Sequence, residues 1–196
     1  FSDVISIEEQ RRILDLLERA EFVDGRQTAG AAAAEVKHNE QLGRGTPAYG
    51  EITDLVLGAL RRNAPFRAAV QPKQMHSMIV SRCGSGMAYG AHVDNAVMDN
   101  GGQLWRSDVS LTLFLNDPSE YEGGNLAVES GSGEMQFKLE ARAMVCYPTT
   151  ALHRVLPVNK GTRLAVVTWI HSLVRDPAAR EILYDLDVTG RRLFEQ

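Results

Sequence analysis

The sequence predicts an α+β fold that is mainly β: a double-stranded β-helix, or jelly roll, braced by N-terminal helices and by a C-terminal helix. Apolar residues recur at helical spacing in positions 1–74, whereas short alternating segments with glycine-rich turns fill positions 75–172. Positions 173–196 return to a helical pattern. With 196 residues, of which 44% are hydrophobic, the chain fits one domain over 1–196 made of these three parts.

Three helices are indicated by their first residues. Residues 6–17 begin with the capping box S-I-E-E and continue with an apolar stripe. Residues 46–62 begin with threonine and proline, as helices often do, and we expect this helix to stop at N-A-P, residues 63–65. Residues 176–185 begin with aspartate and proline and predict the C-terminal helix.

The strands follow from a change of period. Residues 109–115 alternate strictly, with valine and leucines on one face and Ser110, Thr112 and Phe114 on the other. Residues 162–171 are apolar on both faces, which predicts a central strand covered on both sides. Further short strands are expected at 125–129, 134–139 and 143–147, separated by glycine-containing and polar turns.

Charge and composition exclude several classes of protein. The formal net charge is −4, whereas a domain that binds duplex DNA needs a basic patch, so we expect no nucleic-acid partner. No apolar run approaches the ~20 residues of a membrane span, and the first residues do not resemble a signal peptide, so we expect no membrane association. Two cysteines, Cys83 and Cys146, predict free thiols in a cytoplasmic protein.

Three residues point to a metal site. His92 and Asp94 form the motif H-V-D, and on an extended strand residues two apart project from the same face. His153 lies 59 residues after Asp94, at the expected start of another strand. Two histidines and one carboxylate on one face of a metal are typical of non-heme Fe(II) oxygenases, which keep the opposite face open.

Zinc is the competing metal. A structural zinc site usually has a fourth protein ligand, and no cysteine or histidine lies close in sequence to either part of this triad. An approach in space by Cys83 or Cys146 stays open at this point.

Arg163 is the fourth candidate. A turn separates residues 153–156 from residues 162–171, so we expect these two segments to pair as antiparallel strands. Arg163 would then lie opposite Val155, on the face of His153 and diagonal to it, about 7–8 Å away. A guanidinium at this distance suits the far carboxylate of a five-carbon diacid that binds the metal at its other end.

The other histidines have simpler interpretations. His171 ends the expected central strand and is predicted to be structural. His76 precedes the strand that leads to H-V-D and is more typical of a strand residue than of a substrate-binding one. His38 is predicted to face solvent.

At these residues the sequence resembles the iron(II)/2-oxoglutarate-dependent dioxygenases of the prolyl-hydroxylase type, and within them the bacterial PKHD-type (PiuC-like) hydroxylases. The matching segments are F-V-D-G-R-Q-T-A-G near Phe22, V-K-H-N-E-Q-L near Val36, Y-G-A-H-V-D-N-A around His92, R-S-D-V-S-L-T-L-F-L at Arg106, Y-E-G-G at Tyr121, Y-P-T-T-A-L-H-R-V at Tyr147 and W-I-H-S-L-V-R-D at Trp169. Together they span nearly the whole chain.

The resemblance implies iron ligands at His92, Asp94 and His153 and a 2-oxoglutarate-binding arginine at Arg163. It also implies O2 as the oxidant, succinate and CO2 as co-products, and ascorbate as a further ligand. The acceptor would be a peptidyl or amino-acid group or a small siderophore-like molecule.

Two departures from the family pattern bear on these expectations. Cys83 stands where the family usually has a tyrosine beside the cosubstrate, so we expect either that Thr112 or Tyr89 compensates for that tyrosine or that the pocket has a different shape. Relatives usually continue into a further helical segment beyond the point where this sequence ends at Gln196, which leaves open its role in forming a homo-oligomer or in capping the substrate.

The predicted function is therefore hydroxylation by an Fe(II)- and 2-oxoglutarate-dependent dioxygenase. The alternative is a non-catalytic jelly-roll module that binds a metal or another ligand. A halogenase is disfavoured, because that chemistry usually replaces the metal-binding carboxylate by a small residue, and Asp94 is present.

Overall fold

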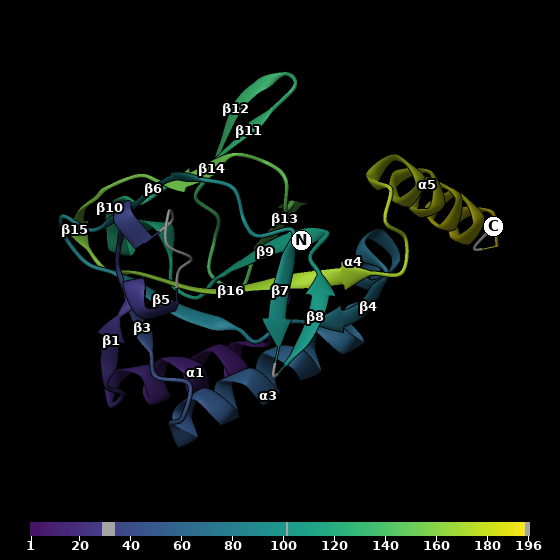
Figure 1. Cartoon of the computed structure of the whole chain (residues 1–196). Coiled ribbons are helices and arrows are strands. Elements are labelled where there is room, and N and C mark those ends of the chain that lie inside the picture. The colour runs from purple at the N-terminus through teal and green to yellow at the C-terminus, as the bar shows by residue number, and fades with distance from the viewer. Residues whose placement is uncertain (29–33, 101, 195–196) are drawn as a thin grey trace.

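The computed structural model describes residues 1–28, 34–100 and 102–194, and two β-sheets dominate it (Figure 1). The larger sheet has the strand order β1-β3-β5-β16-β9-β13, and β4 also pairs with β16. Its strands are β1 (Phe22–Asp24), β3 (Glu40–Leu42), β4 (Pro72–Met75), β5 (Ile79–Cys83), β9 (Val109–Phe114), β13 (Met144–Pro148) and β16 (Arg163–Ser172).

The smaller sheet has five strands in the order β12-β11-β14-β6-β2. They are β2 (Lys37–His38), β6 (Ala88–His92), β11 (Leu126–Ser130), β12 (Gly133–Phe137) and β14 (His153–Val155). Two separate ribbons pair β7 (Val97–Asn100) with β8 (Gln103–Arg106), and β10 (Tyr121–Gly123) with β15 (Val158–Gly161).

Helices brace the larger sheet, and α1 and α3 run along its outer side (Figure 1). The helices are α1 (Ile7–Glu18), α3 (Pro47–Arg62), α4 (Ala64–Val70) and α5 (Pro177–Phe194), with short 3-10 turns η1 (Gly25–Thr28) and η2 (Pro118–Glu120). The capping box at Ser6 and the cap at Thr46 are confirmed. Ile13 and Ile52 from these helices join one buried core with Leu111 and Val166 of the sheet.

Alternation along two central strands separates this core from the inside of the double sheet. On β9, Leu111 and Leu113 pack toward the helices, whereas Ser110 and Thr112 lie on the other face. The expected central strand is confirmed as β16, which is hydrogen-bonded to β5 on one side and to β9 on the other. Side chains on the inner faces of the two sheets do not belong to this core and can therefore form a site between the sheets.

Three boundaries differ from the sequence expectations. Residues 1–74 are not only helical, because they also supply β1, β2 and β3 and most of β4 to the two sheets. A short additional helix, α4, follows the predicted stop, with Asn63 ending one helix and capping the next. Helix α5 continues to Phe194 rather than ending at Asp185, since a single Gly190 costs only about 1 kcal/mol in a helix.

Two further expectations concern cysteines and membranes. Cys83 and Cys146 are both free thiols, as predicted. Within the described ranges, no helix combines the length and the apolar character needed to span a bilayer.

Candidate active site

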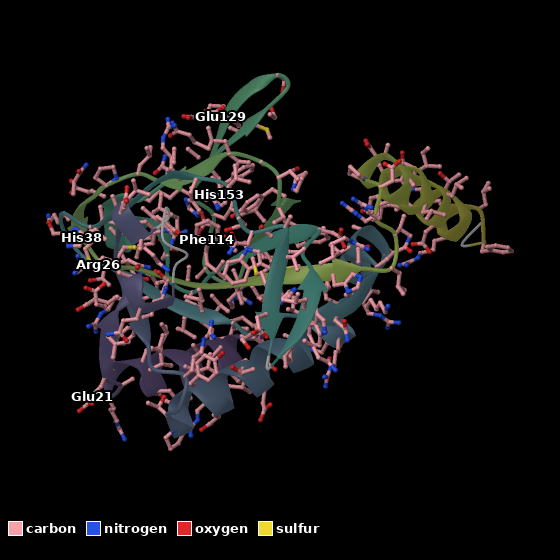
Figure 2. The ribbon with its side chains drawn as sticks, in the orientation of Figure 1. Glu21, Arg26, His38, Phe114, Glu129 and His153 are labelled. Carbon is pink, nitrogen blue, oxygen red and sulfur yellow. The ribbon has the colours of Figure 1, made fainter. Side chains whose placement is uncertain are left out.

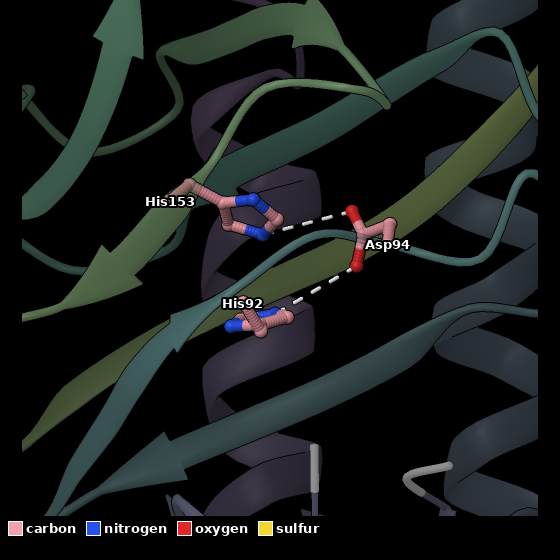
Figure 3. A group of neighbouring side chains, drawn as sticks. All are labelled: His92, Asp94 and His153. Atoms are coloured by element: carbon pink, nitrogen blue, oxygen red, sulfur yellow. Dashed lines mark ion pairs between the residues drawn. The ribbon is translucent and has the colours of Figure 1, made fainter. Parts of the chain in front are cut away.

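His92, Asp94 and His153 converge on one point on the inner side of the smaller sheet (Figure 3). One ligand atom from each lies within 4.8 Å of the other two. His92 Nε2 is 3.7 Å from Asp94 Oδ1, and His153 Nε2 is 3.6 Å from Asp94 Oδ2. The three side chains that the sequence pattern joined are therefore neighbours in space.

Strand pairing brings the two histidines together. His92 on β6 is directly opposite His153 on β14, and their ring centroids are 4.2 Å apart. Asp94, in contrast, lies beyond the end of β6, which stops at His92. The expectation that His92 and Asp94 share a regular strand face was thus wrong for Asp94, whose carboxylate is oriented by other contacts.

Both imidazoles are oriented by the same kind of contact, from Nδ1 to a backbone carbonyl. His92 Nδ1 lies 2.8 Å from the Gly90 carbonyl and His153 Nδ1 lies 3.0 Å from the Ala151 carbonyl. Because a carbonyl oxygen only accepts, each Nδ1 carries a proton, so that in the neutral ring it is Nε2 that has the lone pair available to a metal. Burial, together with the neighbouring His153, lowers the pKa of His92, which favours the neutral ring that a metal requires.

A buried chain of hydroxyls holds the Asp94 carboxylate. Ser110 Oγ donates to Asp94 Oδ2 at 2.6 Å. Thr149 Oγ1 lies 3.3 Å from Ser110 Oγ and 3.2 Å from Ser107 Oγ, and all three hydroxyl-bearing residues are buried. Sequence reasoning placed Ser110 on the correct face of its strand but gave it no role. The sequence feature that could have indicated this role is the presence of two polar residues, Ser110 and Thr112, on one face of an otherwise apolar strand.

The donor set matches Fe(II) better than structural zinc. Two imidazoles and one carboxylate supply three protein ligands, which is the donor set of non-heme Fe(II) oxygenases, whose remaining coordination positions are open to exogenous ligands. Among the described residues, neither Cys83 nor Cys146 joins this group as a fourth ligand. Within the described part of the chain, neither cysteine therefore acts as the fourth ligand that a structural zinc site would need.

A cavity of about 330 Å³ contains the triad and extends between the two sheets. Arg163 lines this cavity, but it projects from a different sheet than the one expected. Residues 153–156 and 162–171 do not pair with each other: β14 lies in the smaller sheet, and β16 lies in the larger one, where Arg163 pairs with Cys83. The prediction that Arg163 lies opposite Val155 was therefore wrong, since β15 intervenes and the chain crosses between sheets.

Arg163 is nonetheless aimed at the cavity and is firmly placed. The side chain of Asn116 fixes the backbone on both sides of Arg163. Its Nδ2 donates to the Thr162 carbonyl at 2.8 Å, and its Oδ1 accepts from Leu164 N at 2.9 Å. Only 2% of Arg163 is exposed, its guanidinium lies 5.2 Å from the Phe114 ring centroid, and Nε and Nη2 have no hydrogen-bond partner. A buried cation with unpaired donors is costly unless an anion completes it.

Comparison with known proteins identifies the family. Residues 78–171 match the 2OG-Fe(II) oxygenase superfamily. A PKHD-type hydroxylase from Synechococcus sp. is 46% identical over 99% of this chain and 87% of its own length. Another from Picosynechococcus sp. is 50% identical over 98% of this chain and 86% of its own length. The chain belongs to the PKHD-type hydroxylases.

Solved structures agree on the fold. A prolyl hydroxylase from Trichoplax adhaerens, in complex with a hypoxia inducible factor peptide fragment, covers 88% of this chain and 82% of its own with a TM-score of 0.60 at 15% identity. HygX from Streptomyces hygroscopicus, with nickel, 2-oxoglutarate and hygromycin B bound, gives the same coverage with a TM-score of 0.59 at 15% identity. The predicted double-stranded β-helix is thus confirmed for this PKHD-type hydroxylase.

The family assignment makes the protein an Fe(II)- and 2-oxoglutarate-dependent hydroxylase with an unidentified acceptor. Other cavity-lining residues named from the sequence are Thr112, Tyr89 and Cys83. Tyr89 stacks on His92, with centroids 3.7 Å apart and an interplanar angle of 18°. Thr112 and Cys83 come from the larger sheet, on the same strands that flank Arg163.

The remaining histidines of this PKHD-type hydroxylase lie outside the triad. His38 is exposed, as predicted. His171 is half-buried on β16, with Nδ1 3.4 Å from Gln74 Oε1, which agrees with a structural role. His76 is buried directly after β4, with its ring 5.5 Å from that of Trp105.

Proposed function

We propose that His92, Asp94 and His153 bind the catalytic Fe(II) of this hydroxylase. The observation that carries the proposal is the convergence of two Nε2 atoms and one carboxylate within 4.8 Å, with both Nδ1 atoms engaged by backbone carbonyls. These contacts leave each imidazole a single free coordinating nitrogen and fix its direction. The chain therefore contributes three metal ligands whose orientation is fixed before the metal binds.

We propose further that Arg163 binds the distal carboxylate of 2-oxoglutarate, with Thr112 and Tyr89 lining the cosubstrate pocket. Support comes from the burial of Arg163 and the two unpaired donor nitrogens at the edge of the cavity that holds the triad. Iron, 2-oxoglutarate and O2 together would supply the oxidising chemistry: one oxygen atom of O2 enters the cosubstrate, which becomes succinate and CO2, and the other oxygen atom enters the acceptor. The protein orients the two partners and excludes bulk water from the space between the sheets.

The acceptor is proposed to be a peptidyl or amino-acid group or a small siderophore-like molecule. Two structures of the same fold carry a peptide fragment and hygromycin B, so the fold accommodates both chemical classes. Residues 1–196 would act as one catalytic domain. Binding of ascorbate, a cytoplasmic location and a homo-oligomeric state stay predictions from the sequence.

The first test is an anaerobic titration of the purified protein with Fe(II) and then with 2-oxoglutarate. We expect one iron per chain and a weak visible absorption band that appears only when both are present. The same titration with Asp94→Ala should show neither. Absence of the band in wild-type protein that retains iron would refute 2-oxoglutarate binding at this centre. Succinate release in the presence of candidate peptides and small molecules would then identify the acceptor class.

A further inference from the structure

The cavity extends beyond the space that iron and 2-oxoglutarate would fill. Trp169 lines it from β16, six residues after Arg163. Because a strand rises about 3.3 Å per residue, these two residues lie roughly 20 Å apart along β16, which is farther than a five-carbon diacid reaches. The triad lies near the Trp169 end, since Ser110, the strand partner of Trp169, donates to Asp94. Lining residues close to the triad but away from Arg163 are therefore available to the acceptor.

Lys37 is a buried cation in this lining that plays no part in the sites proposed for iron and 2-oxoglutarate. It lies on β2 opposite Tyr89 of β6, and only 5% of it is exposed. Its strand neighbour His38 is exposed at the edge of the molecule (Figure 2), and successive side chains of a strand point to opposite faces, so Lys37 points inward. Its Nζ lies 5.1 Å from the centroid of the Tyr89 ring, which stacks on His92. The ammonium is therefore close to the triad.

Arg44 brings a second positive charge to the same cavity. It follows β3 and is exposed, so it lies at the opening of the cavity whereas Lys37 lies inside. Burial lowers the pKa of Lys37 to about 8; the carboxylate of Asp94 opposes this shift, and the charge of Arg44 adds to it. A buried cation beside another cation is costly unless an anion accompanies the two.

The charges of a loaded site leave this pair of cations without a counter-charge. Fe(II) and Arg163 together carry as much positive charge as Asp94 and 2-oxoglutarate carry negative charge, so the loaded centre is neutral as a whole. Asp94 would then be engaged by the metal and would no longer balance Lys37. The other carboxylate in the described lining is that of Asp99, which is exposed and whose Oδ1 accepts from Gly102 N at 2.7 Å. An anionic acceptor would supply the missing charge.

We propose that the acceptor carries a free carboxylate and that Lys37 and Arg44 bind it, so that the rest of the acceptor lies beside the triad. An ammonium and a guanidinium offer only donors, which suits the acceptor oxygens of a carboxylate. Trp169 also fits a ligand with oxygen atoms, because its Nε1 is buried without a partner among the described residues. The inference rests on the proposed function and narrows the acceptor to an α-carboxylate, either of a free amino acid or of a peptide's last residue.

Binding can be followed by tryptophan fluorescence, since Trp169 lines the cavity and the chain has two tryptophans. Two sets of probes are titrated into Fe(II)- and 2-oxoglutarate-loaded protein without oxygen. One set contains N-acetyl amino acids and their amides, which mimic the last residue of a peptide, and the other contains free amino acids and their amides. In one of the two sets an acid should bind roughly 10- to 100-fold more tightly than its amide, and that set identifies the source of the carboxylate.

Two variants assign this preference to the cations. Lys37→Met should remove the preference for the acid and leave 2-oxoglutarate affinity unchanged. Arg44→Gln, an exposed change, should weaken binding of the acid but not of the amide. Lys160→Met is the matched control, because the Lys160 side chain is 80% exposed and does not line the cavity. This control should keep the acid preference of wild type.

Three results would overturn the inference and leave the proposed function intact, provided that the visible band with Fe(II) and 2-oxoglutarate forms. The first is that no acid in either set binds more tightly than its amide. The second is that Lys37→Met and Arg44→Gln keep the preference of wild type. The third is a loss of 2-oxoglutarate affinity in Lys37→Met, because the lysine would then serve the cosubstrate. Absence of the band in wild type would overturn both.

Discussion

Arg163 lies directly opposite Cys83 in the ladder between β16 and β5, and its guanidinium lies 5.2 Å from the Phe114 ring centroid. It therefore projects from the larger sheet, whereas His92 and His153 project from the smaller one. A ligand that contacts both the triad and Arg163 must bridge the two sheets. This arrangement suits a diacid whose two ends are recognised by different chemistry.

Replacement of Arg163 by alanine should therefore weaken 2-oxoglutarate binding strongly. Loss of one member of a buried charge pair costs about 2–5 kcal/mol, or roughly 30- to 5,000-fold in affinity. Arg163→Lys should recover only part of this, because an ammonium lacks the planar fork of donors. The measurement is 2-oxoglutarate affinity of the Fe(II)-loaded protein, with the exposed Arg61→Ala as control. Equal affinities in all four proteins would contradict the assigned role.

Asp94→Ala should abolish iron binding and hydroxylation while the fold persists. Asp94 supplies the only carboxylate of the triad, and the scaffold depends instead on the apolar core around Leu111 and Val166. Iron content and succinate release report the loss, and the thermal midpoint of unfolding reports the fold. Asp54→Ala, an exposed change on α3, should behave as wild type in all three assays. Substantial hydroxylation by Asp94→Ala would remove this residue from the ligand set.

Ser110→Ala should lower iron affinity without removing any ligand. The Ser110 hydroxyl donates to Asp94 Oδ2 at 2.6 Å and is itself completely buried. Loss of such a supporting contact typically reduces metal affinity about 10- to 100-fold, because the carboxylate is no longer oriented. Competition with a metal chelator gives the affinity, and Ser132→Ala in the exposed β11–β12 turn is the control. An unchanged chelator midpoint would mean that Ser110 does not orient Asp94.

Both cysteines should react slowly with iodoacetamide at pH 8 in the native protein. Burial raises the pKa of Cys83, and burial raises the pKa of Cys146 to about 12, so the thiolate fraction at pH 8 falls below that of an ordinary cysteine. Unfolding in guanidinium should expose two rapidly reacting thiols, and 2-oxoglutarate should slow Cys83 further because that residue lines the cavity. Mass spectrometry of timed samples checks this. Rapid native labelling of Cys83, or a Cys83–Cys146 disulfide, would contradict it.

Local patterns in the sequence were sufficient for helices α1 and α3, for the central strands β9 and β16, and for the choice of a candidate metal site. Capping residues at Ser6 and Thr46 act within one helical turn, and the alternation along residues 109–115 reports directly which side chains face the core. His92, Asp94 and His153 were recognisable because the chemistry of a metal demands particular side chains, whatever fold carries them.

Only the tertiary structure decided how these side chains are supported and which sheet each one comes from. Arg163 was predicted to pair beside His153 because the two segments are close in the chain, yet β15 intervenes and β16 joins the opposite sheet. Ser110 donates a hydrogen bond to Asp94 although the two residues are 16 positions apart in the chain. Periodicity reports which face of an element is buried but not which partner covers it, because pairing between distant strands depends on packing of the whole chain.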